Sequence, residues 1–261
     1  MIHETAVISK NSQIDETTNI GPFCVIGDGV TIGKNNNLIS HVSITGNTKI
    51  KDGNVFYPFC SIGSDPQDLK YNNEKSFLKI GSNNRFRENV TVNPGTYGGG
   101  LNTIIYDNCL FMVGSHIAHD CIIKSNVILA NNATLAGHVE IHNNAIVGGN
   151  SAIHQFVRIG KYAMIGGMSG VEKDIIPYGL YMGIRENLKS LNLVGLKRKG
   201  LKSNLINEIK KLINQIFDKN DAIENNIKKD VITNSQILEI TEITDFLNVN
   251  SKRGITAFEN D

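Results

Sequence analysis

The strongest constraint in this sequence is an apolar residue that returns at every sixth position. The first uninterrupted run covers residues 8–62, and each sixth residue in it is Ile, Leu or Phe. The same spacing returns over residues 80–92, shifts by one residue, and continues over residues 105–171. A period of six fits neither an α-helix, whose period is 3.6, nor an ordinary strand, whose period is two. The chain must therefore fold into a structure that repeats every six residues.

A six-residue period is typical of a parallel β-helix, in which each hexapeptide forms a short strand and a corner. Three hexapeptides, about 18 residues, close one triangular coil, and the coils stack at a strand spacing of about 4.8 Å. Gly and Asn are frequent around the apolar positions, as tight corners require. We predict a mainly β fold, with a parallel β-helix over residues 1–185. The repeat is interrupted at residues 63–79 and 93–104, which we expect to leave the solenoid as loops.

The character of the sequence changes after Pro177. Glycine is absent between Gly200 and Gly254, and apolar residues return at helical spacing. The helical pattern consists of Leu201, Leu205, Ile209, Leu212, Ile213 and Ile216, followed by Ile237, Ile240, Ile243, Phe246 and Leu247. Residues 186–261 are therefore predicted to form a small α-helical C-terminal domain.

The bulk composition argues against several function classes. The 261 residues carry a formal net charge of +1, so we expect no nucleic acid partner. The four cysteines are far apart and include no C-x-x-C pair, which indicates buried free thiols in a reducing compartment. No stretch approaches the roughly 18 apolar residues of a membrane span, and the N-terminus lacks the pattern of a signal peptide. We expect a cytoplasmic protein without an integral membrane segment.

The segment "GSHIAHDC", residues 114–121, gathers chemically active side chains in a chain with only seven histidines. On an 18-residue coil, His119 lies one coil below Gly137, and Asp120 lies below His138. His154 follows within two coils, so several polar residues gather on one side of the solenoid.

Three interpretations of this segment remain open from the residues alone. Its histidines are structural, or they bind a metal such as zinc, or His119 is a general base whose tautomer is fixed by Asp120. In the last case the Gly137 N–H would face an oxyanion. The catalytic and the metal interpretations rank about equally at this point.

An ordered set of motifs resembles the UDP-N-acetylglucosamine O-acyltransferases, a family of hexapeptide-repeat acyltransferases. The motifs are "QDLKY" (67–71), "HIAHDC" (116–121), "LANNATLAGHV" (129–139), "HQF" (154–156) and "GLKRKG" (195–200). The resemblance implies a left-handed β-helix, since periodicity does not determine the hand. It also implies transfer of a 3-hydroxyacyl chain from acyl carrier protein to the 3-hydroxyl of UDP-N-acetylglucosamine, the first step of lipid A biosynthesis.

The resemblance further implies roles for individual residues. His119 is the general base, Asp120 orients it, and the Gly137 amide stabilises the oxyanion. No metal and no cofactor are required, because phosphopantetheine arrives on the acyl carrier protein. The substrate contacts implied are Asp68, Lys70, His116, His138, His154, Gln155, Asn192, Arg198 and Lys199.

Three more expectations concern the acyl chain, the assembly and the carrier protein, and the first two follow from the same resemblance. Gly167 matches the position that limits acyl length, where glycine favours a longer chain. The family is a homotrimer with active sites between neighbouring β-helices, so the same is expected here. A basic group that is expected to face the acidic carrier protein comprises Arg158, Lys161, Lys173, Lys197, Arg198 and Lys199.

The sequence departs from the family pattern in two places. Asn93 and Pro94 stand before Gly95 and Thr96, where the family often has histidine and arginine. Val194 stands where some members carry an acidic residue near the nucleotide. The alternatives are a metal-dependent β-helix hydratase of the carbonic anhydrase type, an acyltransferase acting on an amine, and a non-enzymatic solenoid scaffold.

Overall fold

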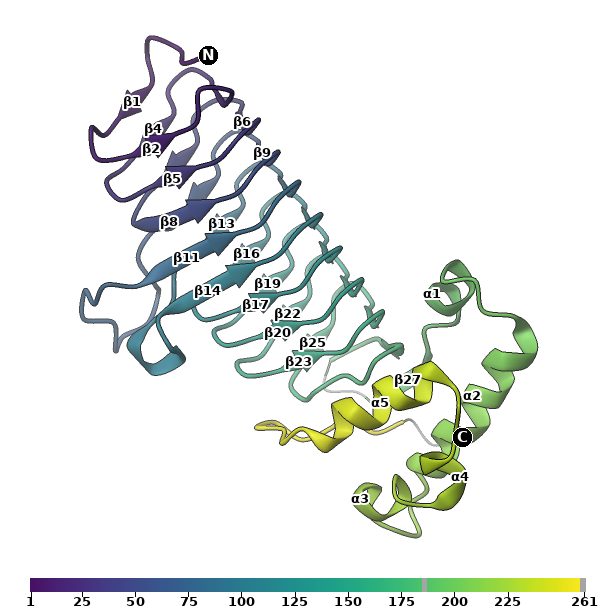
Figure 1. Ribbon diagram of the computed structural model, residues 1–261. Helices are drawn as coiled ribbons and strands as arrows, with labels where there is room; N and C mark the ends of the chain where they lie inside the picture. Colours follow the sequence, from purple (N-terminus) through teal and green to yellow (C-terminus); the bar gives the residue numbers. More distant parts are fainter. Residues whose placement is uncertain (185–186, 259–261) are drawn as a thin grey trace.

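The computed structural model describes residues 1–184 and 187–258. They form a left-handed parallel β-helix with helices at its C-terminal end (Figure 1). Three sheets run along the solenoid, and up to Tyr181 each strand pairs in parallel with its equivalents in neighbouring coils. We call the turn from the first to the second sheet the first corner, from the second to the third the second corner, and from the third to the first the third corner. The predicted fold class is confirmed.

Most strands are two residues long, and up to Val171 they recur in strict rotation among the sheets. The first sheet contains β1 (Val7–Ile8), β4 (Val25–Ile26), β7 (Ser43–Ile44), β10 (Ser61–Ile62), β13 (Thr91–Val92), β16 (His116–Ile117), β19 (Thr134–Leu135), β22 (Ala152–Ile153) and β25 (Gly170–Val171). The second sheet contains β2 (Gln13–Ile14), β5 (Thr31–Ile32), β8 (Asn47–Ile50), β11 (Phe77–Ile80), β14 (Asn102–Ile105), β17 (Ile122–Ile123), β20 (Glu140–Ile141) and β23 (Arg158–Ile159). The third sheet contains β3 (Asn19–Ile20), β6 (Asn37–Leu38), β9 (Val55–Phe56), β12 (Arg85–Phe86), β15 (Leu110–Phe111), β18 (Ile128–Leu129), β21 (Ile146–Val147), β24 (Met164–Ile165), β26 (Gly179–Tyr181) and β27 (Leu188–Leu191).

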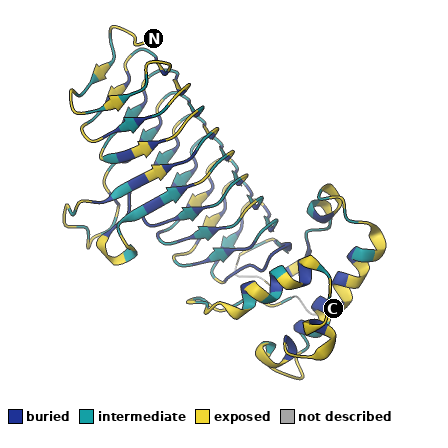
Figure 2. Cartoon of the chain, viewed as in Figure 1, coloured by how far each residue is buried: buried dark blue, intermediate teal, exposed yellow. Residues whose placement is uncertain are grey.

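The second residue of each two-residue strand points into the solenoid and packs on its equivalents in neighbouring coils. From Ile20 onward these inward residues are buried (Figure 2). Phe56, Phe86 and Phe111 form a stack inside the third sheet, with ring centroids 4.7 and 4.8 Å apart. The four cysteines are likewise buried and unpaired, as predicted. The six-residue period is thus the period of the core.

Buried asparagines join successive coils at the second corner. Asn36, Asn54 and Asn84 are completely buried. The Asn54 side chain donates to the carbonyl of Gly81 at 3.0 Å and accepts from the backbone N–H of Asn84 at 2.9 Å. The side chain of Asn36 accepts from the backbone N–H of Asn54 in the same way, at 2.9 Å. This ladder satisfies corner backbone groups that the short strands leave unpaired.

Both loops are shorter than the sequence predicts. β11 begins at Phe77 and β14 at Asn102, so the last three residues of each predicted interruption belong to a strand. The reason is that these strands bury two inward residues each, Leu78 before Ile80 and Thr103 before Ile105. The six-residue pattern marks only the second of each pair.

The helical region is built from five helices within the described residues. They are α1 (Leu193–Arg198), α2 (Ser203–Ile216), α3 (Ile223–Asn226), α4 (Asp230–Thr233) and α5 (Leu238–Asn248). The helices predicted from the apolar stripes correspond to α2 and α5, whose apolar faces are buried. None of the described helices has the length and hydropathy needed to cross a bilayer.

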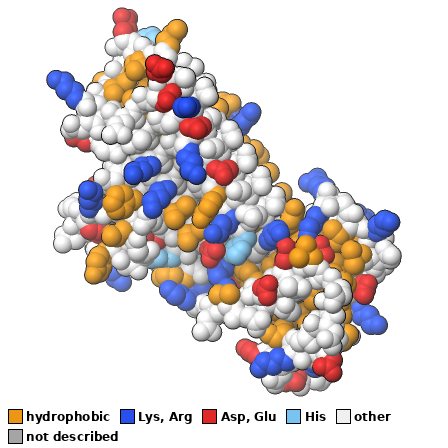
Figure 3. All heavy atoms as spheres, viewed as in Figure 1, with side chains coloured by type: hydrophobic (Ala, Val, Ile, Leu, Met, Phe, Trp, Pro, Cys, Tyr) orange, Lys and Arg blue, Asp and Glu red, His pale blue; other side chains and the backbone are white. Residues whose placement is uncertain are grey.

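The boundary predicted between residues 185 and 186 lies outside the described residues. Beyond it, β27 pairs antiparallel with β26, so the third sheet continues to Leu191. After α5 the chain returns to the solenoid, where Asp174 donates its N–H to the carbonyl of Gly254 and accepts from the N–H of Thr256. Acidic and basic side chains are interspersed over the face drawn in Figure 3, in keeping with the small net charge.

Candidate active site

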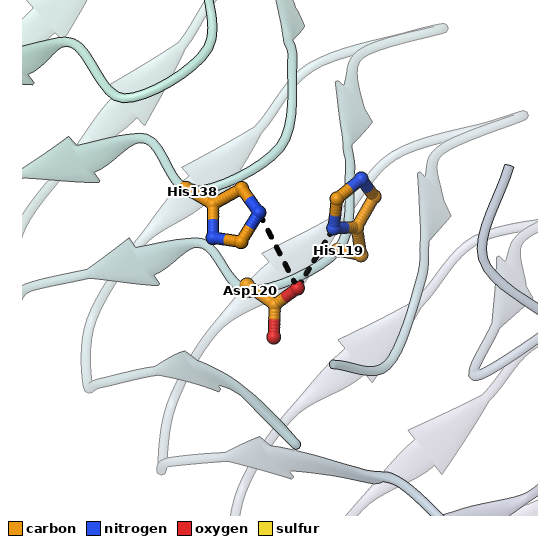
Figure 4. A group of neighbouring side chains, drawn as sticks. All are labelled: His119, Asp120 and His138. Carbon is orange, nitrogen blue, oxygen red and sulfur yellow. Dashed lines mark hydrogen bonds and ion pairs between the residues drawn. The ribbon is translucent and has the colours of Figure 1, made fainter. Parts of the chain in front are cut away.

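A buried histidine–aspartate pair lies at the first corner, directly after β16. The exposed fractions of His119 and Asp120 are 4% and 6%. The Nδ1 atom of His119 lies 2.8 Å from Oδ2 of Asp120 (Figure 4). Asp120 has a left-handed backbone, with φ of 60°, and its N–H donates to the hydroxyl of Thr103 at 2.8 Å. The corner therefore holds the carboxylate against the imidazole of its own neighbour in the chain.

Thr96 holds the other side of the Asp120 carboxylate. The backbone N–H of Thr96 donates to Oδ1 at 2.8 Å, and its hydroxyl donates to Oδ2 at 2.6 Å. Burial by itself would raise the pKa of Asp120, but the hydrogen bonds from His119 and Thr96 outweigh burial and lower it. Because an ionised carboxylate only accepts, the hydrogen of the neutral imidazole lies on Nδ1, and Nε2 is left as an acceptor.

Thr96 comes from the second loop, and sequence reasoning missed it. The two loops pack on each other, since Glu74 accepts the backbone N–H of Tyr97 at 2.9 Å. A Cβ on Gly99 would lie 2.0 Å from the Asp120 carboxyl carbon, so this glycine lets the loop approach. The run of three glycines in this loop was the available signal, but nothing in the six-residue pattern connects it with Asp120.

Gly137 lies one coil above His119, as the 18-residue spacing predicts. The N–H of His138 donates to the carbonyl of His119 at 2.9 Å. A Cβ on Gly137 would lie 2.4 Å from Cε1 and 2.6 Å from Nε2 of His119, so only glycine leaves room for the ring. The Gly137 N–H donates no hydrogen bond within the described part of the chain. It is therefore available to a ligand beside Nε2.

His138 completes the cluster from the next coil. Its ring is perpendicular to that of His119 at a centroid distance of 5.1 Å, and its Nε2 lies 3.8 Å from Oδ2 of Asp120. Its other face stacks on Phe156, with centroids 4.4 Å apart. Burial lowers the pKa of His138, although the charge of Asp120 opposes this effect. The site thus holds a second imidazole beside His119, and burial favours the neutral form of this second ring.

Three predicted substrate contacts lie on β16 and in the first loop, and two of them, His116 and Asp68, are close to this cluster. His116, on β16, lies with Nδ1 2.7 Å from the hydroxyl of Thr91, and burial lowers its pKa. Asp68 is half-buried in the first loop, and its negative charge acts on the titration of His138, so it lies within electrostatic range. Lys70 is exposed in the same loop, and its N–H donates to the Asp68 side chain at 3.0 Å.

Two other predicted substrate contacts lie at the first corner but outside the His119 cluster. His154 and Gln155 follow β22 and are exposed. In the His154 ring, Nδ1 lies 3.3 Å from the carbonyl oxygen of Gln155. Both side chains are thus accessible along the edge that carries His119.

Three further residues that are predicted to contact the substrate lie beside the third sheet of the solenoid. Asn192, Arg198 and Lys199 line a cavity of about 700 Å³ between the third sheet and α1. The Asn192 side chain caps α1 by accepting the N–H of Gly195 at 2.9 Å, and it donates to the carbonyl of Tyr162 at 2.9 Å. Its role visible in this chain is to fix α1. Arg198 is exposed.

The Lys199 ammonium belongs to a polar network between the solenoid and α5. It lies 2.6 Å from a carboxylate oxygen of Glu239 and donates to the Tyr178 hydroxyl at 3.0 Å. Tyr178 in turn donates to Glu242, which also pairs with Lys161. Sequence reasoning proposed Lys199 as a substrate contact, whereas in the folded chain its charge is already paired. It anchors the end of α1.

Gly167 lies at the third corner, away from the edge that carries His119. A Cβ there would lie 3.3 Å from the carbonyl oxygen of Gly149, so a small side chain would need only a slight shift. Within one chain, the predicted length-determining position and the predicted base therefore face different directions.

The distances in the His119 cluster would also suit a metal ion. The ligand atoms of His119, Asp120 and His138 all lie within 4.8 Å of one another. A metal held by Nδ1 of His119 and Oδ2 of Asp120 would replace the hydrogen between these two atoms and compete with the Thr96 hydroxyl for Oδ2. In this structure, Nδ1 of His119 and Oδ2 of Asp120 are hydrogen-bonded to each other.

Comparison with known proteins identifies the family. Two family models match: "Udp N-acetylglucosamine O-acyltransferase; Domain 2" over residues 174–256, and "Bacterial transferase hexapeptide (six repeats)" over residues 102–137. A protein from Thermodesulfovibrio yellowstonii, named acyl-[acyl-carrier-protein]--UDP-N-acetylglucosamine O-acyltransferase, is 46% identical over 97% of this chain and 98% of its own. The chain belongs to the UDP-N-acetylglucosamine O-acyltransferases.

Solved structures of UDP-N-acetylglucosamine acyltransferases match along the whole chain. The protein from Francisella novicida is 35% identical with a TM-score of 0.93, covering 100% of this chain and 95% of its own. The protein from Campylobacter jejuni is 35% identical with a TM-score of 0.91, covering 99% and 100%. The likeness includes the helical region, and the resemblance drawn from the motifs is confirmed.

Proposed function

We propose that this protein transfers a 3-hydroxyacyl chain from acyl carrier protein to the 3-hydroxyl of UDP-N-acetylglucosamine. This would be the first step of lipid A biosynthesis, carried out in the cytoplasm. The observation that supports it best is the buried His119–Asp120 pair, whose free Nε2 lies beside Gly137. A base and an adjacent unpaired N–H are what acyl transfer requires.

The proposed chemistry follows from this geometry. Nε2 of His119 removes the proton of the sugar 3-hydroxyl while its oxygen attacks the thioester carbonyl carbon. The negative charge that develops on the carbonyl oxygen is stabilised by the Gly137 N–H, a contribution of about 2.7–4 kcal/mol in comparable sites. The tetrahedral intermediate then expels the phosphopantetheine thiolate, which takes up the proton from His119. Asp120 stabilises the imidazolium between the two proton transfers.

We propose that this reaction needs neither a metal nor a cofactor of its own. Phosphopantetheine enters as part of the acyl carrier protein and leaves with it. The hydrogen bonds that Asp120 accepts from Thr96 and His119 favour its role as an orienting carboxylate over that of a metal ligand.

We also propose a homotrimer whose active sites lie between neighbouring β-helices. Support comes from the placement of the residues: His119 lies at the first corner, Gly167 at the third corner, and Arg198 beside the third sheet. A single chain cannot bring these residues to one substrate, whereas the edges of two neighbouring chains can. Arg198 would then bind a phosphate of the nucleotide as a charge-assisted donor.

The test is a transfer assay with UDP-N-acetylglucosamine and a series of 3-hydroxyacyl carrier proteins. We expect product with the unmodified protein in the presence of a chelator, and a loss of at least about 100-fold in His119→Ala. His41→Ala, an exposed corner histidine, is the matched control and should retain activity. If no acyl donor gives product while elemental analysis finds a bound metal, the metal-dependent hydratase is favoured instead. Transfer that is lost to the chelator would contradict only the metal-independent mechanism.

A further inference from the structure

The C-terminal segment brings a lysine to the edge that carries the active site. After α5 the chain returns along the solenoid, where Nε of Arg253 donates to the carbonyl of Glu172 at 2.9 Å. The backbone of Gly254 and Thr256 is hydrogen-bonded to Asp174. These bonds fix residues on the C-terminal side of Lys252, so its position does not depend on its own side chain.

Lys252 extends the stack of side chains at the first corner. Its ammonium lies 4.7 Å from the centre of the Phe156 ring, and Phe156 stacks on His138. Asp120, His138 and Phe156 occupy equivalent left-handed corner positions in successive coils. Lys252 thus takes the next place in a column that starts at Asp120, although it comes from a segment far away in the sequence.

The charge of Lys252 is available to a ligand. Its side chain is exposed and forms no ion pair within residues 1–184 and 187–258. Burial is the main reason why the pKa of His138 is lowered, and the positive charge of Lys252 adds to this effect. The charge of the Lys252 ammonium therefore acts on a residue of the His119 cluster. Contact with an aromatic face holds it in place without neutralising it.

The distance of Lys252 from His119 distinguishes the phosphate of the acyl donor from the phosphates of the sugar nucleotide. Three steps of the coil stack separate Lys252 from the layer of His119, which corresponds to about 14 Å. The arm between the sulfur and the phosphorus of phosphopantetheine has about a dozen bonds and spans on the order of 15 Å when extended. From the sugar 3-hydroxyl to the nearer phosphorus of the nucleotide, about five bonds span only roughly 6 Å.

We propose that Lys252 binds the phosphate that joins pantetheine to the acyl carrier protein. This inference rests on the proposed acyl transfer for its substrate, and it assigns a contact for the donor rather than the acceptor. With its phosphate on Lys252, the arm would run past Phe156 and His138 and place the thioester beside His119. A lysine suits this task because a compact ammonium binds a phosphate as a point charge.

The experiment compares donors that differ only in this phosphate. The KM values for 3-hydroxyacyl-phosphopantetheine, for 3-hydroxyacyl-pantetheine and for UDP-N-acetylglucosamine are measured with the unmodified protein, Lys252→Ala and Lys252→Arg. We expect Lys252→Ala to raise the KM of the phosphorylated donor about tenfold, with the other two KM values and kcat unchanged. Lys252→Arg should restore most of the affinity.

The matched control is Lys211→Ala, which removes the same charge from the exposed face of α2. It should leave all three KM values unchanged. An equal effect of Lys252→Ala on both donors, or an effect confined to UDP-N-acetylglucosamine, would overturn the proposal.

A binding measurement separates this proposal from the proposed reaction. Calorimetry with phosphopantetheine and with pantetheine needs no turnover, and Lys252→Ala should weaken binding of the first ligand alone. If the unmodified protein gives no product with any donor but shows this difference in binding, the reaction fails and the phosphate contact stands. If it shows transfer but no dependence on Lys252, the contact fails and the reaction stands.

Discussion

At the scale of single residues, the contact between Gly137 and the His119 ring is the constraint that bears most directly on the proposed chemistry. The glycine is required by space alone, because an added Cβ would fall within 2.6 Å of two ring atoms. Its backbone needs no left-handed conformation, since its φ is outside that region. The ring and the N–H beside it are therefore positioned by the same residue.

Gly137→Ala should lower kcat by on the order of 100-fold while leaving the fold intact. The new methyl group would push the Cε1 and Nε2 atoms of His119 away from the substrate. A misplacement of about 1 Å typically costs on the order of 100-fold in kcat. The measurement is kcat in the transfer assay, with thermal unfolding as a check of the fold. Gly98→Ala is the control, since a Cβ there meets nothing within 4 Å. Equal activity of both variants would contradict the assigned geometry.

At the scale of elements, the buried asparagines show what joins one coil to the next. Each two-residue strand supplies few ladder hydrogen bonds, and the corner side chains supply others. Asn54 bonds to both neighbouring coils through its side chain amide. The stack is therefore held by polar bonds at the second corner as well as by the apolar core.

Asn54→Ala should lower the free energy of unfolding by about 2 kcal/mol, because it leaves buried backbone groups of Gly81 and Asn84 without a partner. The measurement is urea denaturation followed by circular dichroism. Asn37→Ala, at an exposed position of β6, removes a similar side chain and should change the free energy little. A similar loss in both variants would show that the ladder contributes nothing specific.

The packing of α5 on the second sheet includes a histidine that should make stability depend on pH. Burial lowers the pKa of His142 below 6.5, while Glu140 opposes this effect and Lys124 and Arg158 add to it. Its ring packs edge-on against Phe246 of α5, at a centroid distance of 5.7 Å. Below about pH 6.5 the unfolded chain takes up a proton that the folded chain resists.

The contribution of neutral His142 to the free energy of unfolding should therefore be fully present above about pH 6.5. It should be lost as the pH is lowered through the folded pKa of His142. Unfolding in urea at pH 7.5 and pH 5.5 measures this difference. His142→Gln should make the difference smaller without removing it, because burial also lowers the pKa of His116 and His138. An unchanged difference would exclude His142 as a source of the effect.

At the scale of the whole molecule, the proposed sites combine His119 of one chain with Arg198 of its neighbour. His119→Ala should lose activity by at least about 100-fold, and Arg198→Ala by on the order of tenfold or more. Co-expression of the two variants should restore about a quarter of the normal rate, because random assembly leaves both residues intact at that fraction of the interfaces. The measurement is activity of purified mixed oligomers, with light scattering to confirm three chains.

Separately purified variants that are mixed without exchange of subunits provide the control and should stay inactive. Mixed oligomers that are no more active than the separate variants would place the whole site within one chain.

The sequence by itself determined the solenoid and the cluster at its first corner. A six-residue period reports directly on which side chains enter the core, and an 18-residue coil fixes which residues stack. The placement of Gly137 over His119 and of His138 beside Asp120 followed from that spacing alone. Local periodicity was sufficient because each coil contacts chiefly the coils next to it.

Only the tertiary structure decided which residues outside the repeat reach the site. Thr96 arrives from a loop and Lys252 from the C-terminal segment, and neither position is related to Asp120 or Phe156 by any spacing. Lys199 sits in a basic motif, yet its charge is paired with Glu239 of α5. Contacts between segments without a common period depend on how loops and helices pack, and packing is a property of the folded chain.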